Sequence, residues 1–292
     1  MKRLLFAGAA VAALAVAAPA SAQTKTLKLL SSWDRSNYAA LEGALVYQEQ
    51  LKKLSGGKLV VDLKGPETVP PFQQIQPVSA GVFDFFDKYY QKHNKLTMIA
   101  MPIIGTHGYQ IVLRDALSAE GDFKGRKIRC TQSYFGVVKA LGGTPVVLPP
   151  AEVYSALEKG VVEGATWPAA GIYTMKWYEV AHYRVRPTFG TTNTPMLINM
   201  NAWGKLTAAE QKLLLDAGRE TEKLMIKQGD VTLAKEEAEL DKLGMKYAQL
   251  SPEKGAMVKR LWVTSLWELA EQCCADGAKE LREIARKANL TN

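Results

Sequence analysis

Cysteine and histidine are scarce in this 292-residue chain, with three of each, and this scarcity excludes several kinds of site. Cys273 and Cys274 are adjacent, and adjacent cysteines rarely bridge each other because the bond geometry strains the intervening peptide. No disulfide framework is therefore expected, and we interpret these two and Cys130 as small buried residues. No Cys or His spacing typical of zinc occurs, so the sequence predicts no metal and no cofactor.

Motifs of nucleophilic and nucleotide chemistry are also missing. The chain has no G-x-S-x-G, no P-loop and no G-x-G-x-x-G. Cys130 has no nearby histidine in the sequence, and the carboxylates lie on the polar faces of predicted helices. We therefore expect a protein that is not an enzyme, with a secreted α/β enzyme as the least favoured alternative.

Charge of one sign is not concentrated anywhere. Lysine and arginine number 37 against 29 acidic residues, which gives a formal net charge of +8. This excess suits anionic partners or solubility. No arginine-rich tract or interleaving of aromatic and basic residues is present, so no nucleic-acid partner is expected. A hydrophobic content of 47% is typical of a globular protein.

A long apolar run occurs only at the N-terminus. Lys2 and Arg3 precede an apolar stretch that reaches Ala18, and Ala20-Ser21-Ala22 forms an A-x-A site. The run is short for a membrane span of about 20 residues. We interpret residues 1–22 as a signal peptide cleaved after Ala22, which predicts an exported, soluble chain that does not span the membrane.

The remaining pattern alternates strands and helices. A first β-α-β unit is predicted from a strand at 28–31, a helix at 38–54 and a strand at 58–63. A second unit combines a strand at 127–130, a helix at 134–141 and a strand at 145–148. This alternation indicates an α/β protein with open, mostly parallel sheets, which bind ligands at the carboxyl ends of their strands.

Further elements follow from local signals. Helices are predicted at 86–92 and from Pro149 to Leu157, and a buried strand at 98–104. Thr207 to Glu210 form a capping box that opens a long helix reaching Leu243. A strand at 245–250 and a helix from Ser251 follow, and Gly277 is expected to interrupt that helix.

Residues 122–203 carry an ordered run of motifs. Residues 122–129 read DFKGRKIR, residues 141–154 read LGGTPVVLPPAEVY and residues 160–165 read GVVEGA; KWYEV at 176–180 and INMNAW at 198–203 follow. The run resembles the "DLKGLKIR", "LGATPVxLPxxEVY" and "GVVDGA" motifs of the solute-binding proteins of tripartite ATP-independent periplasmic (TRAP) transporters, the dicarboxylate-binding-protein family.

The resemblance implies a two-lobed periplasmic binding protein fold that closes over a ligand. Lobe I would occupy residues 23–113 and lobe II residues 114–190, with hinge strands and long helices in 191–292 completing both. The implied function is capture of a small organic acid in the periplasm of a Gram-negative bacterium, as a monomer, and its delivery to the membrane permease. An extracytoplasmic sensing receptor for an organic acid is the alternative.

The same resemblance gives a set of candidate ligand-binding residues. Arg129 stands where the family's arginine binds the ligand's carboxylate, and a planar guanidinium matches two carboxylate oxygens. Tyr154 and Asn199 lie in matching motifs. Gln110 stands near the family's frequent second arginine, and Trp167 replaces its asparagine before a proline. These two departures favour a monocarboxylate with an apolar or aromatic body.

One departure affects the length of lobe I. After Asp84 the family normally continues for several tens of residues before a segment like the one that begins here at Phe85. The sequence therefore predicts an internal deletion at this junction, with the loss of a strand and unpaired sheet edges in lobe I.

Overall fold

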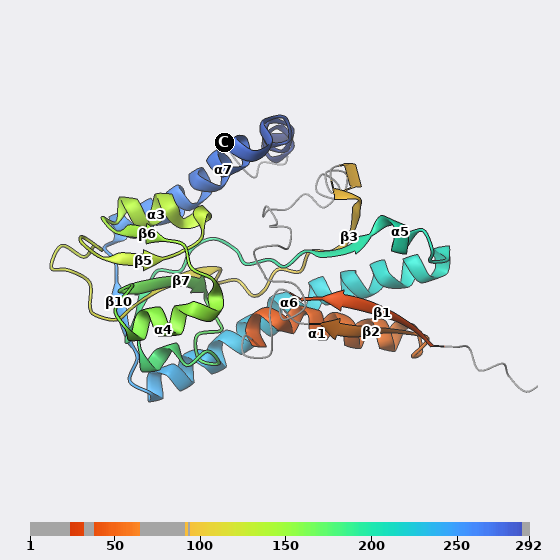
Figure 1. Ribbon diagram of the computed structural model, residues 1–292, viewed down its shortest axis with the longest axis horizontal. Helices are drawn as coiled ribbons and strands as arrows, with labels where there is room; N and C mark the ends of the chain where they lie inside the picture. The colour runs from red at the N-terminus through yellow and green to blue at the C-terminus, as the bar shows by residue number, and fades with distance from the viewer. Residues whose placement is uncertain (1–23, 32–37, 65–90, 93, 288–292) are drawn as a thin grey trace, which may run out of the picture.

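The computed structural model describes residues 24–31, 38–64, 91–92 and 94–287. The expected signal peptide, the Asp84–Phe85 junction and most of the helix predicted at 86–92 lie outside these residues. Within them, the chain forms two α/β lobes at opposite ends of an elongated molecule, joined by crossing segments and a long helix (Figure 1).

Lobe I begins with the first predicted β-α-β unit, which is confirmed. Strand β1 (Lys25–Leu30) pairs in parallel with β2 (Leu59–Lys64), and helix α1 (Tyr38–Leu54) connects them. Tyr47 and Leu51 of α1 are buried in the core of this lobe. The helix ends where Gly56 and Gly57 adopt positive φ, a conformation that glycine takes without steric cost.

A second pair of strands completes the described part of lobe I. Strand β3 (Leu96–Ala100) lies antiparallel to β9 (Met196–Asn199), which leads into the short helix α5 (Met200–Trp203). The strand predicted at 98–104 therefore begins and ends earlier than expected. Ile99 of β3 and Met196 of β9 share one apolar core with α1 and β2, so both strand pairs belong to one lobe.

Lobe II is built on a six-stranded sheet in the order β10-β8-β4-β7-β5-β6. The three strands that carry the site are β4 (Tyr109–Leu113), β5 (Lys127–Arg129) and β7 (Gly164–Pro168). The others are β6 (Thr144–Val146), β8 (Tyr183–Arg186) and β10 (Lys246–Gln249). Strand β4 is antiparallel to β7 and β8, and the remaining pairings are parallel. The boundary expected at 113–114 lies at the end of β4, inside this sheet.

Helices cover both faces of this sheet, as Figure 1 shows. Helix α3 (Phe135–Ala140), preceded by the 3-10 turn Gln132–Tyr134, lies between β5 and β6, which confirms the second β-α-β unit. Helix α4 (Val153–Glu158) lies on the opposite face, after the turn Pro150–Glu152. A third turn, Trp177–Glu179, packs its Trp177 into the core below α4.

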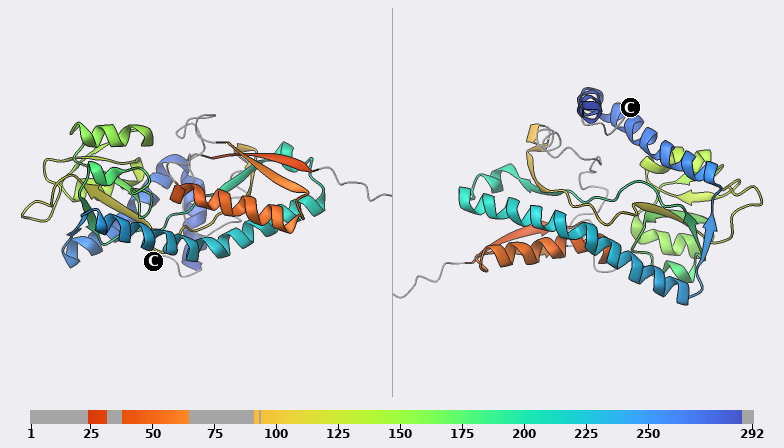
Figure 2. Two further views of the ribbon diagram at one scale, coloured as in Figure 1. Left: turned by 90° about the horizontal axis from the view of Figure 1, so that it is seen from below. Right: turned by 180° about the vertical axis from the view of Figure 1, so that it is seen from behind.

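Two long helices pass between the lobes. Both views of Figure 2 show α6 (Ala208–Lys242) running from lobe I to the far side of lobe II. Its capping box is confirmed, because the Glu210 amide donates to Thr207 Oγ1 at 3.2 Å and the Thr207 amide to Glu210 Oε2 at 2.8 Å. Helix α7 (Pro252–Lys287) packs Trp262 in lobe II and Leu281 against Met98 of lobe I.

The predicted interruption of this last helix at Gly277 is wrong. The irregular residue is Cys274, with φ −154° and ψ 58°, and Gly277 lies inside helix α7. A glycine inside a helix costs only about 1 kcal/mol, which the packing of a long amphipathic helix offsets. The position of the kink has no local signal in the sequence.

The three cysteines are free thiols, but only one is fully buried as expected. Cys130 lies in the core of lobe II, and burial raises the pKa of its thiol to about 11. Cys273 on α7 is exposed and Cys274 is half-buried, which corrects the interpretation of all three as buried residues. The described residues contain no group of three or more His, Cys, Asp or Glu that could bind a metal.

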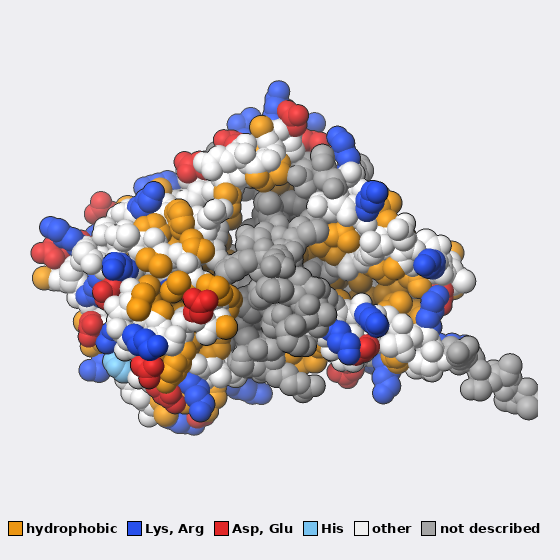
Figure 3. All heavy atoms as spheres, viewed as in Figure 1, with side chains coloured by type: hydrophobic (Ala, Val, Ile, Leu, Met, Phe, Trp, Pro, Cys, Tyr) orange, Lys and Arg blue, Asp and Glu red, His pale blue; other side chains and the backbone are white. Residues whose placement is uncertain are grey.

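The described surface and helices agree with the composition. In Figure 3, basic and acidic side chains are interspersed over the visible face, so the net positive charge is not gathered there. Among the residues that the structure describes, no helix has the length and apolar character needed to cross a membrane.

Candidate functional site

The candidate site lies at one edge of the lobe II sheet. The parallel strands β5, β7 and β8 all end there, at Arg129, Pro168 and Arg186. The antiparallel strand β4 begins at the same edge, at Tyr109. Open α/β sheets bind ligands outside the carboxyl ends of their parallel strands, so this edge is where the topology predicts a ligand.

Arg129 is buried at this edge, with 3% of its surface exposed. Its Nε and Nη2 donate to the carbonyl oxygen of Leu148 at 3.0 and 2.9 Å, and its Nη1 donates to that of Thr166 at 3.3 Å. Three of the five N–H groups of a guanidinium are thus used, and no described carboxylate pairs with Arg129. Desolvation lowers its pKa to about 10, which leaves it protonated at neutral pH. A buried cation with carbonyl partners alone is suited to an anionic ligand.

Trp167 is brought together with Arg129 by the strand register. Arg129 lies opposite Ala165 on β7, and Trp167 follows two residues later on the same face. The guanidinium carbon lies 5.4 Å from the centroid of the indole. The same indole packs against Trp177, with 4.9 Å between ring centroids, and belongs to the core of the lobe. Its role as a wall of the ligand cleft stays a prediction.

Gln110 belongs to the same group of residues, since it lies opposite Trp167 in the β4–β7 register. It is 1% exposed, and its Nε2 donates to the carbonyl oxygens of Pro168 at 3.3 Å and Ala169 at 2.5 Å. Its Oε1 accepts a hydrogen bond of 3.1 Å from Arg186. Gln110 therefore supports the end of β7, and its polar atoms are already engaged within the protein.

Tyr154 has a different partner. It lies on α4, and its hydroxyl donates to Glu179 Oε2 at 2.6 Å. This bond is the main reason why the pKa of Tyr154 is raised to about 12, so the hydroxyl keeps its proton. The structure thus directs the polar atom of Tyr154 to Glu179 rather than to Arg129, and its part in ligand binding stays a prediction.

Asn199 lies away from these residues. It ends β9 in lobe I, and its side-chain oxygen accepts hydrogen bonds from the amides of Asn201 at 2.9 Å and Ala202 at 3.3 Å. It therefore caps helix α5. Figure 1 places α5 at the opposite end of the molecule from β5, so the structure does not bring Asn199 together with Arg129.

Sequence reasoning missed two further arginines on β8. Arg184 is fully buried and Arg186 half-buried, and the guanidinium carbons lie 4.2 and 5.0 Å from the ring centroid of Tyr247. Arg184 forms an ion pair with Asp241 of α6, and Arg186 with Glu237. The sequence signal for these two arginines is the Arg-Val-Arg alternation at 184–186. Such an alternation usually indicates a strand that directs its charged side chains toward solvent, so it did not point to buried arginines.

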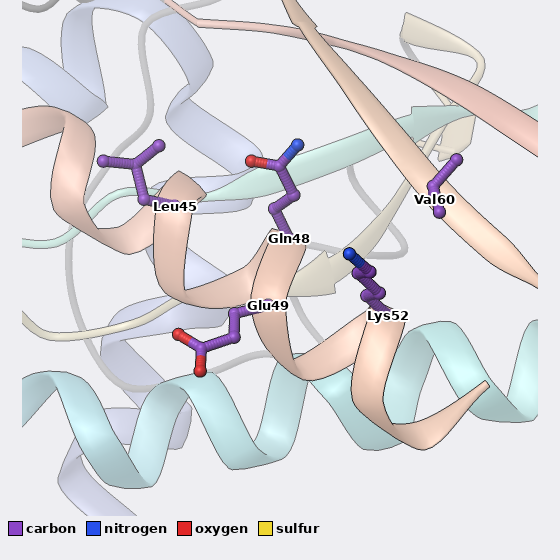
Figure 4. Close-up of a pocket in the computed structure, with 5 residues that line it drawn as sticks. All are labelled: Leu45, Gln48, Glu49, Lys52 and Val60. Atoms are coloured by element: carbon purple, nitrogen blue, oxygen red, sulfur yellow. The ribbon is translucent and has the colours of Figure 1, made fainter. Parts of the chain in front are cut away.

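A pocket of about 360 Å³ lies elsewhere, on lobe I. Figure 4 shows its lining from α1 and β2, by Leu45, Gln48, Glu49, Lys52 and Val60. Lys52 and Glu49 bring opposite charges, and Gln48 already donates to the Val61 carbonyl at 2.8 Å. This pocket offers no buried cation, and Arg129 remains the stronger candidate for an acid.

Comparison with known proteins identifies the family. Residues 71–270 match the model of DctP, bacterial extracellular solute-binding protein family 7. The C4-dicarboxylate-binding periplasmic protein DctP of Rhodobacter capsulatus is 26% identical over 319 aligned positions, which cover 92% of this chain and 93% of that protein. These positions outnumber the 292 residues of the chain, so the relative carries residues that this chain lacks.

Two further matches differ in how much they cover. The ectoine-binding periplasmic protein TeaA of Halomonas elongata is 29% identical over 142 residues, which span 48% of this chain and only 40% of that relative. A TRAP periplasmic solute-binding protein from Desulfovibrio salexigens, solved with bound orotic acid, superposes with a TM-score of 0.74 at 18% identity, over 92% of this chain and all of that one. The second match shows the two-lobed α/β fold. The chain therefore belongs to the DctP family of bacterial extracellular solute-binding proteins, the TRAP-transporter receptors that its motifs resemble.

Proposed function

We propose that this protein is a periplasmic receptor that captures a small organic acid through Arg129 and delivers it to a TRAP permease. The observation that carries the proposal is the state of Arg129: a buried, protonated guanidinium at the carboxyl ends of the lobe II strands, whose described hydrogen-bond partners are carbonyl oxygens. The two N–H groups left over can meet the two oxygens of a carboxylate.

The family relatives support an acid as the ligand. The R. capsulatus relative is named for C4-dicarboxylates, and the D. salexigens structure holds orotic acid. Both ligands carry a carboxylate, which is the group that a guanidinium recognises best. Closure of the two lobes over the ligand would then be a two-state equilibrium that the ligand shifts by binding the closed form more tightly.

Export and assembly form part of the same proposal. We expect cleavage after Ala22, so mass spectrometry of the exported protein should show a chain that starts at Gln23. A mature chain that retains Met1 would contradict this step. The receptor would act as a monomer and would bind its acid without chemical change.

The test begins with a thermal-shift screen of mono- and dicarboxylates, because a ligand that binds the native state raises stability by RT ln(1 + [L]/Kd). Calorimetric titration then compares the wild type with Arg129→Ala and Arg129→Lys. Arg129→Ala should cost about 2–5 kcal/mol of binding free energy, or roughly 30- to 5,000-fold in Kd, since the carboxylate is left desolvated and unpaired. Arg129→Lys keeps the charge but loses the planar fork, and should bind with intermediate affinity.

Lys127→Ala is the matched control. Lys127 is an exposed cation two residues earlier on β5, so its loss removes the same formal charge without touching the proposed site. We expect no more than a small change in Kd for this variant, because exposed charges are screened. Unchanged affinity in Arg129→Ala, or an equal loss in Lys127→Ala, would contradict the assignment of Arg129.

A further inference from the structure

Three arginines lie on one face of the lobe II sheet. Arg129 is opposite Ala165 of β7, and Arg184 is opposite Val112 of β4. Ala165 and Val112 belong to the same core cluster on the α4 side of the sheet. Because side chains alternate along a strand, Arg186 shares the face of Arg184. The sheet therefore directs three cationic side chains to one side.

Helix α6 supplies carboxylate partners for two of these three arginines. Glu237 and Asp241 are four residues apart, so they lie one above the other on the face of α6 that meets β8. Asp241 pairs with Arg184, and Glu237 pairs with Arg186 and lies 3.9 Å from Arg184. Arg186 additionally donates to Gln110 Oε1 at 3.1 Å. Arg184 and Arg186 are thus neutralised within the protein.

Arg129 receives no such anion. Its partners among the described residues are the carbonyls of Leu148 and Thr166 and the face of Trp167. Among the described residues, Asp241 and Glu237 pair with two of the three guanidiniums, and the buried Glu236 beside them is bound by backbone amides of Gly171 and Tyr173. Arg129 is therefore the guanidinium of this face that has no described carboxylate partner. A ligand whose charge matches that of Arg129 therefore carries one negative charge.

We propose that the site selects monocarboxylates and discriminates against acids with a second ionised group. The inference rests on the proposed function, because it concerns the acid that Arg129 binds. A second carboxylate would enter a desolvated site in which the described residues offer it no unpaired cation, and a buried charge without a partner is strongly unfavourable.

The selectivity depends on Gln110, because this residue lies where a second cation would have to stand. It lies on β4, two strands from β5 and two residues away from the register position of Arg129, or roughly 12 Å between backbones at ~4.8 Å per strand and ~3.3 Å per residue. A guanidinium at that distance could meet the far end of a short diacid. Gln110 brings no charge, however, and its amide is fixed on Pro168 and Ala169. The nearest guanidinium beyond it, on Arg186, is already paired with Glu237.

The first experiment uses matched acids that differ by one ionised group. Succinate is compared with succinamate and phthalate with phthalamate, by calorimetric titration of the full mature protein at pH 7.5, where every carboxyl is ionised. In each pair the amide replaces a carboxylate with a neutral group of nearly the same shape. We expect the half-amide of at least one pair to bind about tenfold or more tightly than its diacid.

The second experiment changes the charge of the protein. Glu237→Gln removes the anion that neutralises Arg186 and conserves side-chain volume, so it should raise affinity for the diacid relative to the half-amide by severalfold. Gln110→Arg, which places a cation on β4, should shift the same ratio further. Glu239→Gln is the control, because this exposed residue of α6 pairs with Lys242 and should leave the ratio unchanged.

The outcomes separate this inference from the proposed function. Diacids that bind as tightly as their half-amides in both pairs, or an unchanged ratio in Glu237→Gln, overturn the monocarboxylate selectivity, while loss of binding in Arg129→Ala would still support the receptor function. Absence of binding by every acid screened overturns both. Preference for the half-amide in the wild type, together with a shift toward the diacid in Glu237→Gln, supports the inference.

Discussion

The guanidinium carbon of Arg129 lies 5.4 Å from the indole centroid of Trp167, so this buried cation rests against an aromatic ring. The strand register sets this contact, since Arg129 is opposite Ala165 and Trp167 follows on the same face of β7. Trp177 supports the indole from the core. A cation over an indole is attracted by about 0.5–2 kcal/mol, which fixes the direction in which Arg129 offers its remaining N–H groups.

The first prediction concerns the two tryptophans. Trp167→Ala should lower the free energy of unfolding by ~3–5 kcal/mol, the usual cost of truncating a core aromatic. It should also weaken acid binding by the folded protein, because Arg129 loses the surface that orients it. Urea unfolding followed by calorimetric titration below the unfolding transition measures the two effects separately.

Trp177→Ala provides the comparison for this variant. Trp177 lies behind Trp167 in the same core and is equally buried, so its truncation should cost a similar free energy of unfolding. Its effect on acid affinity should be clearly smaller than that of Trp167→Ala. Equal affinities in the two variants would show that Trp167 acts only as a core residue.

How far the fold could be predicted depends on the range of the interactions. The limits of α1 and the capping box at Thr207 were predicted correctly because their signals are local: a glycine pair ends the helix, and Glu210 follows the cap by three residues. Strands β4, β7 and β8 were not predicted. Each is five residues or fewer, and their pairing joins segments far apart in the chain, for which the sequence has no local pattern.

In the candidate site, too, some features have a signal in the nearby sequence and others depend on residues far along the chain. Arg129 could be assigned only through the resemblance of the run around it, since composition places it among several basic residues. The neutralisation of Arg184 and Arg186 could not be predicted, because their partners on α6 are 57 and 51 residues away. Asn199 matched a family motif, yet its side chain caps a helix, a role that an asparagine before a short helix fills readily.

The second prediction uses a glycine where the chain segments cross between the lobes. Gly108 has φ +62°, and a Cβ there would lie 2.1 Å from the Gly190 carbonyl oxygen and 2.4 Å from that of Phe189. Gly108→Ala should therefore cost about 3 kcal/mol or more, since left-handed strain adds to a clash with backbone. Gly121, with φ +67° and nothing within 4 Å, is the control, and Gly121→Ala should cost only ~1–2 kcal/mol. If urea unfolding shows the same loss of stability in both variants, Gly108 does not lie in a tightly packed contact between the crossing segments.

The third prediction concerns the start of α6. Thr207→Ala removes the side chain that caps the Glu210 amide and should cost about 1 kcal/mol, or ~2–4 °C in Tm. Thr207→Ser keeps the hydroxyl and should retain most of the stability. Calorimetric melting of the two variants beside the wild type tests this, and an equal loss in both would assign the effect to the methyl group instead.

The fourth prediction is a pH dependence from Glu236. This residue of α6 is buried, and its carboxylate accepts hydrogen bonds from the amides of Gly171 (2.7 and 2.9 Å) and Tyr173 (3.2 Å). Burial nevertheless raises the pKa of its carboxyl above the usual value. As pH rises through about 4.3, the unfolded chain releases this proton before the folded chain does, so the folded state loses stability between the unfolded and the folded pKa.

Glu236→Gln cannot ionise and should lack this loss. The free energy of unfolding of the wild type, minus that of the variant, should therefore be largest near pH 4 and should decline as pH rises. Urea unfolding of both proteins at intervals from pH 4 to pH 7 measures the difference, in which the other titrating groups cancel. A difference that grows with pH would contradict the raised pKa.

The last prediction compares the stability of the two lobes. In the described residues, lobe I has two separate two-stranded sheets, β1–β2 and β3–β9, whereas lobe II has one sheet of six strands. Two-stranded sheets are marginally stable on their own, and these rely on α1 and α6 for their packing. Figure 3 shows apolar side chains gathered at the surface of lobe I, between the region of β1 and β2 and that of β3 and α5.

Amides of the described residues within 27–105 should therefore exchange with solvent faster than those in residues 125–190, because local opening costs less where fewer strands pair. Native-state hydrogen exchange measured by mass spectrometry gives the comparison within one sample. The variant Lys25→Ala adds a second comparison, because it removes the 3.0 Å ion pair between Lys25 of β1 and Glu210 of α6. Amide exchange in β1 and β2 should then accelerate, while exchange in β5 and β7 should stay unchanged. Equal protection of the two lobes would contradict this prediction and would mean that α1 and α6 compensate for the small sheets.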